Sequence, residues 1–255
     1  MPLHRFSRTE ILVGPAGLDR LRRSTVAIFG LGGVGSYAAE ALCRAGVGRL
    51  VLVDFDDICL TNVNRQIHAM DGTIGRAKVQ VMAERLRLIN PDADIVPHKD
   101  FYEADNSDFL LSGGYDYVID AIDHITSKLH LIRSCTDRHL PIIASMGAAN
   151  KLDPTKIHVA DIADTSKCHM ARIVRKLLRK QGIRSGVTVV YSTEEHRQQA
   201  VADAGCRTDC ICPNKEEQRF SCEHRRTILG SVSFIPSIFG LTMAGVVVND
   251  LFARR

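Results

Sequence analysis

Short, uninterrupted apolar runs alternate with amphipathic segments along the first half of the chain. The apolar runs predict strands buried on both faces, and apolar residues three or four positions apart predict helices. Alternating strands and helices are typical of a parallel sheet that is covered on both faces. The pattern therefore predicts an α/β fold, a Rossmann-like, doubly wound and mostly parallel sheet. We expect the strands at 25–29, 49–54, 115–123 and 140–147, and the helices at 35–46, 75–91 and 127–138.

The alternation loosens beyond residue 150, where the chain becomes more polar. Two further strand-like runs with a helix between them predict a C-terminal extension of the same sheet within a single domain, 1–255. A polar, Cys-rich stretch then predicts a long loop of the kind that is usually functional or metal-tied. These strands are expected at 157–162 and 187–192, the helix at about 168–181 and the loop at about 193–227.

Residues 228–249 carry no charge, and the stretch is long enough to consider as a membrane span. Its glycines, serines and the polar residues Thr242 and Asn249 weaken that interpretation. We therefore favour a buried or dimer-interface helix that starts near Pro236, and we expect no membrane partner.

Composition and charge narrow the setting of the protein. The N-terminal sequence MPLHRFSRTE lacks the apolar core of a secretory signal, which favours a cytoplasmic protein. There, metal binding, catalysis or burial explain the eight cysteines better than disulfides do. The net charge is +4, but residues 165–193 contain seven Lys or Arg and no Asp or Glu. This local basic segment predicts an anionic partner.

The sequence GLGGVG at 30–35 follows a predicted strand and opens a predicted helix. Glycines let the backbone approach a phosphate while the helix N-terminus supplies partial positive charge. Asp54 ends the next strand, where an acidic side chain binds ribose hydroxyls. The motif in this context predicts a nucleotide site that includes Gly30, Gly32, Gly33, Gly35 and Asp54.

The stretch DFDDICLTNVNRQIH at 54–68 argues against a nicotinamide cofactor. Arg65 and Lys78 are suited to gripping triphosphate oxygens, and Asn62 to hydrogen-bonding the nucleotide. Asp123 ends a further strand and is suited to holding Mg²⁺. Placed at the carboxyl ends of a parallel sheet, these residues predict ATP and Mg²⁺ as cofactors.

The motifs GLGGVG, LVDFDD, TNVNRQIHA, GRAK and VIDAID resemble the adenylation domain of the ubiquitin-activating superfamily, which uses ATP to adenylate carboxylates. The resemblance implies that residues 20–150 form the nucleotide-binding core and that 151–255 serve substrate binding and dimerisation. RFSR at 5–8 resembles an N-terminal element whose arginine reaches the partner subunit's ATP site. Arg8 matches that arginine, which implies a homodimer. The resemblance assigns catalytic roles to Arg8, Arg65, Lys78 and Asp123, and the metal to Asp123.

Superfamily members that activate sulfur-carrier proteins usually carry two CxxC pairs, and this chain has neither. It carries four cysteines with C-x3-C-x-C-x9-C spacing and two histidines nearby. Tetrahedral zinc, reactive thiols and unligated loop cysteines all remain open interpretations of this irregular spacing. The residues are Cys206, Cys210, Cys212 and Cys222, with His196 and His224.

TNVNRQIHA, LDPTKIHVADIADTS and GSVSFIPSIFG resemble most the tRNA threonylcarbamoyladenosine dehydratase branch of the superfamily. That resemblance implies ATP-dependent cyclisation of a modified adenosine next to the anticodon, through adenylation of its threonyl carboxylate. Ring closure is then intramolecular and depends on positioning rather than on a protein nucleophile.

The helix near 168–181 supports an RNA partner on independent grounds, because its basic residues recur at helical spacing and share one face. A solvated helix face is the alternative interpretation. The predicted tRNA-contacting residues are Arg172, Arg175, Lys176, Arg179 and Lys180.

Two other functions compete with tRNA dehydration. One is adenylation of the C-terminal glycine of a ubiquitin-like sulfur carrier, and the other is a non-catalytic nucleotide-binding partner of a sulfur-transfer protein. The basic helix and the absent CxxC pairs disfavour the former. The complete set of Arg65, Lys78 and Asp123 disfavours the latter. The predicted site does not include His68 or His124. His124 follows Asp123, and contact with substrate or metal is one interpretation of it, but a packed or capping histidine explains it at least as well.

Overall fold

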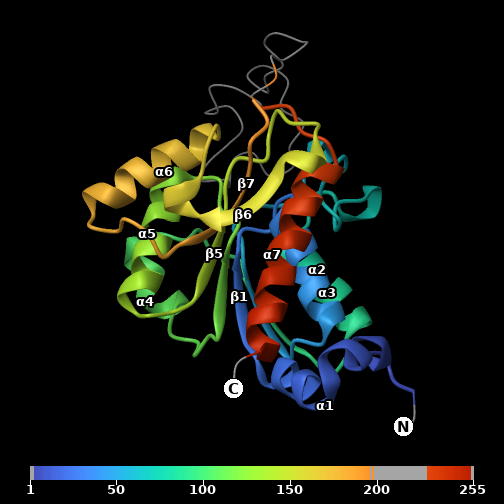
Figure 1. Ribbon diagram of the computed structural model, residues 1–255. Helices are drawn as coiled ribbons and strands as arrows, with labels where there is room; N and C mark the ends of the chain where they lie inside the picture. Colours follow the sequence, from blue (N-terminus) through green and yellow to red (C-terminus); the bar gives the residue numbers. More distant parts are fainter. Residues whose placement is uncertain (1–2, 196, 198–228, 254–255) are drawn as a thin grey trace.

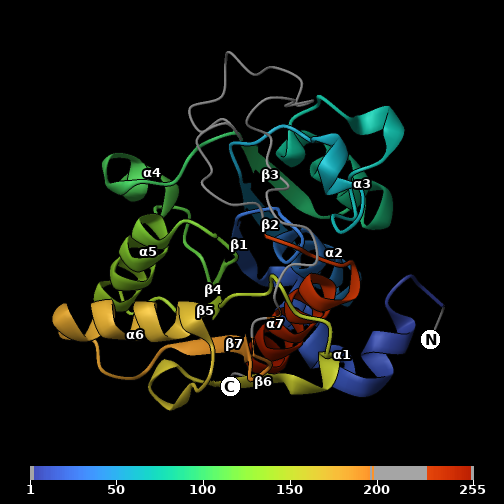
Figure 2. The same cartoon turned by 90° about the horizontal axis from the view of Figure 1, so that it is seen from above.

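The computed structural model describes residues 3–195, 197 and 229–253, and these form a single layer of sheet between two layers of helices (Figures 1 and 2). The described residues form a seven-stranded sheet of order β3-β2-β1-β4-β5-β7-β6. Neighbouring strands are parallel except for β6, which runs antiparallel to β7. The predicted fold is confirmed. The strands are β1 (Thr25–Phe29), β2 (Arg49–Val53), β3 (Asp94–His98), β4 (Tyr117–Asp120), β5 (Ile142–Ser145), β6 (Ile157–Asp161) and β7 (Thr188–Ser192).

Each face of the sheet has its own hydrophobic cluster. Helices α1, α2, α3 and α7 pack on one face, and α4, α5 and α6 on the other, as Figure 2 shows from above. The helices are α1 (Ser7–Arg23), α2 (Gly35–Ala45), α3 (Lys78–Ile89), α4 (Ser107–Leu110), α5 (Ile125–Asp137), α6 (His169–Lys180) and α7 (Phe234–Ala253). Short 3₁₀ turns lie at Leu60–Asn62, Asp71–Thr73, Ala104–Asn106, Pro154–Lys156 and Ile162–Asp164.

The strand order fixes where a ligand binds. From β1 the chain proceeds outward through β2 and β3, and then returns to the other side of β1 through β4 and β5. In open α/β sheets this switch point leaves a crevice at the carboxyl ends of the strands. The register pairs Phe29 with both Val53 and Asp120. The residues that follow these three strand ends therefore lie side by side.

Strand β3 and helices α1 and α4 were not expected from the sequence, and α4 spans only four residues. Strand β3 lies at one edge of the sheet and includes Pro97 and His98, so it lacks the apolar run of a central strand. Helix α1 bends at Gly14, where φ is 72°, and Pro15 follows at once. This interruption hides the helical period of the two halves.

By length and composition alone, helix α7 could cross a membrane. Half of its apolar stretch, however, is buried within the protein. It packs closely on α2, because an added Cβ at Gly240 would lie 2.2 Å from the Val34 carbonyl oxygen. A buried helix starting near Pro236 is therefore what the structure shows. The predicted loop at 193–227 lies outside the described residues beyond Arg197.

Candidate nucleotide site

The glycine-rich turn after β1 has a backbone that larger residues disfavour. Gly30 adopts φ of 90°, and a Cβ there would lie 2.7 Å from the Ala121 carbonyl oxygen. A Cβ on Gly35 would lie 1.8 Å from the carbonyl oxygen of Gly30. Gly32 faces open space, with no described atom within 4 Å of an added Cβ. The turn is thus tight on its protein side and open where a phosphate would approach.

Helix α2 starts at this turn, its N-cap residue Val34 makes no side-chain capping hydrogen bond, and its first turn contains no acidic residue. Such a helix N-terminus attracts anions. The stem of Arg65 lies over the turn, with its Cγ 3.4 Å from an added Cβ at Gly33. Arg65 therefore lies beside the turn and the N-terminus of α2.

Asp54 follows β2 and is buried. Its carboxylate accepts hydrogen bonds from the backbone N–H groups of Leu31, at 2.6 Å, and Asp56, at 2.8 Å. Burial raises the pKa of Asp54, while the Lys78 ammonium group acts in the opposite direction. Besides its predicted role at the ribose, Asp54 thus fixes the glycine turn to the end of the neighbouring strand.

Lys78, the first residue of α3, is buried between two carboxylates. Its Nζ lies 2.6 Å from Asp56 Oδ2 and 4.0 Å from Asp54 Oδ1. Burial alone would lower the pKa of Lys78, but the charges of Asp54 and Asp56 outweigh it and raise that pKa, with a smaller contribution from Asp123. The amine is therefore held as an ammonium ion at the strand ends.

Asp56 was not singled out from the sequence, although it lies nearer to Lys78 than Asp54 does. Its position two residues after Asp54 was the available signal, but spacing cannot show which carboxylate a lysine on a later helix meets. A triphosphate that approached Lys78 would compete with Asp56 for the ammonium group.

Asn62 and Arg65 lie in the segment after β2. The Asn62 side-chain oxygen accepts a hydrogen bond from Cys59 N at 3.1 Å and so caps the 3₁₀ turn. Arg65 Nη1 donates to the Thr61 carbonyl oxygen at 2.8 Å and to Asn64 Oδ1 at 3.0 Å. The guanidinium group is therefore oriented by its own segment before any ligand binds.

The strand expected to end at Asp123 ends at Asp120, and Asp123 is exposed in the turn that follows β4. Below it, Asp120 and Lys128 form a fully buried ion pair, 2.8 Å between Lys128 Nζ and Asp120 Oδ2. The other oxygen of Asp120 accepts a hydrogen bond from Ile122 N at 3.0 Å, which shapes this turn. No group of three His, Cys, Asp or Glu that would hold a metal occurs among the described residues. One exposed carboxylate beside a phosphate site does fit Mg²⁺, which takes few protein ligands and binds phosphate oxygens and water.

Arg8 is exposed on α1, a helix that Figure 1 shows at one end of the sheet. Its neighbour Arg5 donates to the carbonyl oxygen of Ile89, the last residue of α3. Phe6 lies against Gly46, the residue that ends α2. Helix α1 therefore lies at the amino edge of the sheet, opposite the glycine turn, and Arg8 cannot reach the nucleotide site of its own chain.

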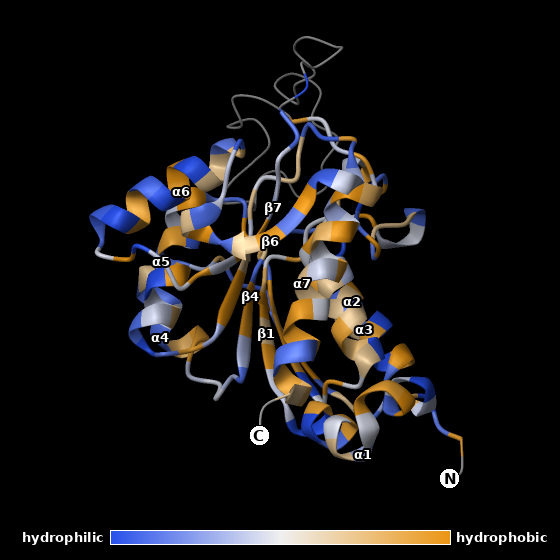
Figure 3. Ribbon diagram, in the orientation of Figure 1, coloured by the Kyte–Doolittle hydropathy of each residue, from blue (hydrophilic) through white to orange (hydrophobic). Residues whose placement is uncertain are grey.

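Helix α6 is hydrophilic along much of its length (Figure 3), and most of its basic residues are exposed. Arg175 differs from the others. Its Nη1 donates to the Thr165 carbonyl oxygen at 2.7 Å and also contacts Thr165 Oγ1, so the side chain is half-buried. It anchors the helix to the preceding turn, which spacing alone could not show. The exposed members of the predicted set are Arg172, Lys176, Arg179 and Lys180.

The described histidines and cysteines that remain from the sequence analysis either cap a helix or are buried. His124 caps α5 through Nδ1, which lies 3.1 Å from Ser127 Oγ. His68 is fully buried, and burial lowers its pKa to about 3. The described cysteines are all buried. The four cysteines and two histidines considered for zinc lie outside the described residues.

The chain belongs to the ThiF family, which it matches over residues 6–252. This confirms the expected membership of the adenylating superfamily. It is 46% identical over 251 residues to the tRNA threonylcarbamoyladenosine dehydratase of Bacillus subtilis, covering 98% of this chain and 95% of that protein.

Solved structures of E. coli tRNA N6-threonylcarbamoyladenosine dehydratase, TcdA, are also similar to this chain. The sequences are 34% identical, and the superposition covers 98% of this chain and 94% of the TcdA chain. The complex with AMP superimposes with a TM-score of 0.84, and the complex with ATP with 0.81. The adenylyltransferase and sulfurtransferase MOCS3 of Aedes aegypti is 34% identical over 151 residues. The matched region is 58% of this chain and 34% of the MOCS3 protein.

Proposed function

We propose that the protein is an ATP-dependent tRNA threonylcarbamoyladenosine dehydratase that adenylates the threonyl carboxylate and closes a ring within the same nucleoside. The geometric observation that carries the ATP chemistry is the buried Lys78 ammonium group, held between Asp54 and Asp56 at the edge where Arg65 covers the glycine turn. The substrate is inferred from similarity to dehydratases along almost the entire chain.

The first step is adenylation. A threonyl carboxylate oxygen attacks the α-phosphorus of ATP, and the bond from that phosphorus to the pyrophosphate oxygen breaks. Lys78 and Arg65 stabilise the negative charge that develops on the departing pyrophosphate, and the first N–H groups of α2 bind phosphate oxygens. Asp54 and Asn62 orient the nucleoside part of ATP.

The second step is ring closure. The carbamoyl group of the same nucleoside attacks the activated acyl carbon and loses a proton, and AMP departs with the former carboxylate oxygen. The products are the cyclised nucleoside, AMP and pyrophosphate, so the nucleoside has lost one water. Because the attacking group is tethered to its target, holding both in place supplies most of the acceleration.

Asp123 is the residue that we assign to Mg²⁺, which would neutralise phosphate charge when bound. Zinc at the Cys-rich segment and a sulfur-transfer protein as a further partner stay hypotheses. We place the enzyme in the cytoplasm, in keeping with a tRNA substrate.

The tRNA is proposed to bind over the exposed basic face of α6. Four cationic side chains there, Arg172, Lys176, Arg179 and Lys180, can contact backbone phosphates. Arg175 contributes by fixing the helix rather than by presenting a free side chain.

A homodimer is proposed because Arg8 lies at the edge of the sheet opposite its own nucleotide site. A second copy would bring its Arg8 to the phosphates. The outer face of α7, with Phe234 and Leu241 exposed, offers apolar surface for such an association.

The direct test is to incubate the protein with ATP, Mg²⁺ and tRNA that carries threonylcarbamoyladenosine, and to weigh the digested nucleosides by mass spectrometry. With wild-type protein and ATP, we expect the modified nucleoside to lose the mass of one water. With the Lys78→Met or Asp123→Ala variant, we expect its mass to stay unchanged. No mass change, together with ATP–pyrophosphate exchange that depends on a small Gly-Gly-ended protein, would favour the sulfur-carrier alternative.

A further inference from the structure

Two asparagines far apart in the sequence connect the nucleotide segment to the part of the chain beyond β5. Asn64 precedes Arg65 and is exposed, and Asn150 follows β5. Neither was singled out from the sequence. Their hydrogen bonds join at Gly230 and Ser231, just before α7.

Both the oxygen and the nitrogen of the Asn64 side-chain amide form hydrogen bonds. Its oxygen accepts the hydrogen bond from Arg65 Nη1 at 3.0 Å, and its nitrogen donates to the Ser231 carbonyl oxygen at 3.0 Å. The orientation of the Arg65 guanidinium group is thereby tied to the backbone that leads into α7.

Asn150 holds the residue next to Ser231. Its Oδ1 accepts a hydrogen bond from Gly230 N at 2.7 Å, and its own N–H donates to the Gly230 carbonyl oxygen at 2.8 Å. Its carbonyl oxygen accepts a third hydrogen bond, from Arg197 N at 3.2 Å. Asn150 adopts φ of 56°, which asparagine tolerates better than most residues.

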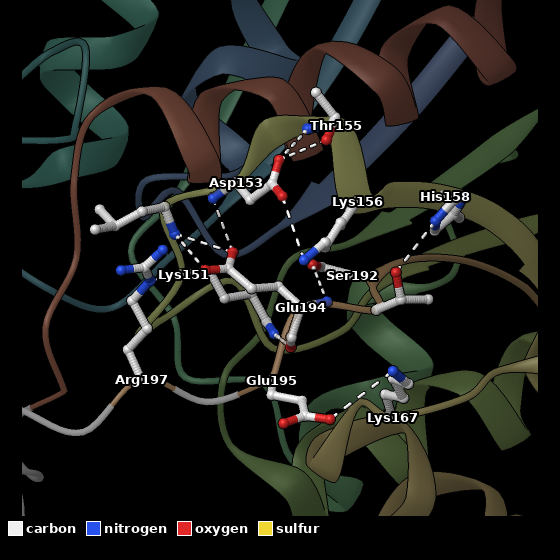
Figure 4. Close-up of polar contacts among 12 residues, drawn as sticks. Lys151, Asp153, Thr155, Lys156, His158, Lys167, Ser192, Glu194, Glu195 and Arg197 are labelled. Atoms are coloured by element: carbon white, nitrogen blue, oxygen red, sulfur yellow. Dashed lines mark hydrogen bonds and ion pairs between the residues drawn. The ribbon is translucent and has the colours of Figure 1, made fainter.

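The residues that follow Asn150 are held by Glu194, and Figure 4 shows these contacts. The buried carboxylate of Glu194 accepts hydrogen bonds from Leu152 N at 3.0 Å and Asp153 N at 2.8 Å. Lys151 Nζ donates to the Glu194 carbonyl oxygen. Residues 150–153 are therefore hydrogen-bonded to Glu194 and Arg197, and Gly230 is joined to them through Asn150.

We propose that Asn64 and Asn150 are positioning residues that hold Arg65 ready for the phosphates of ATP and couple it to the chain at Arg197 and Gly230. This rests on the proposed role of Arg65. A change at the 150–197 junction is transmitted to the phosphate-binding arginine through Gly230, Ser231 and Asn64, without direct contact with the nucleotide.

The test measures ATP affinity by calorimetry with Mg²⁺ and no RNA, so that it does not depend on the identity of the substrate. Asn64→Ala should weaken ATP binding about three- to tenfold, the size expected for the loss of one or two hydrogen bonds. Asn150→Gly keeps the backbone conformation and loses the bond to Gly230 N, and it should weaken ATP binding about two- to threefold. Asn150→Asp retains the side-chain oxygen that accepts the hydrogen bond from Gly230 N, so this variant should bind ATP with the wild-type affinity.

The double variant Asn64→Ala with Asn150→Gly should bind ATP no more weakly than Asn64→Ala alone, because both substitutions break the same connection. His139→Gly is the matched control, since His139 also has positive φ but lies away from the site. The proposal is overturned if Asn150→Gly binds ATP as the His139→Gly protein does, or if the two effects add. Failure of wild-type protein to bind ATP at all would instead count against the proposed function.

Discussion

At the scale of single residues, the nucleotide site places constraints on the stability of the folded protein. Lys78 is buried, and a charge out of water is tolerated only with partners such as Asp54 and Asp56. The pair of carboxylates keeps the amine charged, which phosphate binding needs. Gly35 is similarly constrained, since a Cβ there would collide with Gly30.

His68 predicts a measurable pH dependence of stability. Its pKa is about 3 in the folded protein against an ordinary value of 6.5, so between these values only the unfolded chain takes up the proton. The free energy of unfolding should therefore fall as the pH falls below 6.5, by up to about 1.4 kcal/mol per pH unit from this residue.

Urea unfolding from pH 7 to pH 5 checks this prediction. Because other groups also titrate, wild-type protein is compared with His68→Leu. The wild-type protein should lose about 2 kcal/mol relative to the variant over this range. Parallel stability curves would show that His68 titrates alike in both states.

At the scale of elements, α6 combines two roles on opposite faces. Ala171, Val174 and Leu178 are buried in the hydrophobic cluster on this face of the sheet, whereas the basic side chains other than Arg175 are exposed. The sequence period predicts this division correctly. It could not show that Arg175 turns back to Thr165, because that contact depends on the turn before the helix.

Charge reversal on α6 should weaken tRNA binding. Lys176→Glu with Arg179→Glu removes two exposed cations, so affinity should fall and the slope of log K against log salt should shrink by about two. The control is Arg22→Glu with Arg23→Glu, which reverses two exposed charges on α1. Equal tRNA affinity and salt slope in the α6 variant and the wild type would exclude α6 from the RNA interface.

At the scale of the whole molecule, the strands deliver the glycine turn, Asp54, Lys78 and Asp123 to one edge, and α1 carries Arg8 to the other. The proposed homodimer would bring Arg8 of a second copy to this edge, and activity would then be a property of the dimer.

Mixing two inactive variants tests the shared site. Arg8→Ala and Lys78→Met should each be inactive, but a mixed dimer contains one site with both wild-type residues. With free exchange, half of the dimers are mixed, and activity should return to about one quarter of the wild-type value. The two variants mixed without subunit exchange provide the control, and no recovery after exchange would place Arg8 outside the ATP site.

Local patterns in the chain are enough to predict the central strands, helices α2, α3, α5, α6 and α7 and the nucleotide motif, because apolar runs, helical periods and glycine turns involve residues close in sequence. Only the tertiary structure revealed β3, whose proline and polar residues are tolerated at a sheet edge. It also paired Lys78 with Asp56, turned Arg175 inward and joined Asn64 to Asn150 through Gly230 and Ser231. These contacts link residues on different elements, and their geometry is set when the strands align, not by the spacing along the chain.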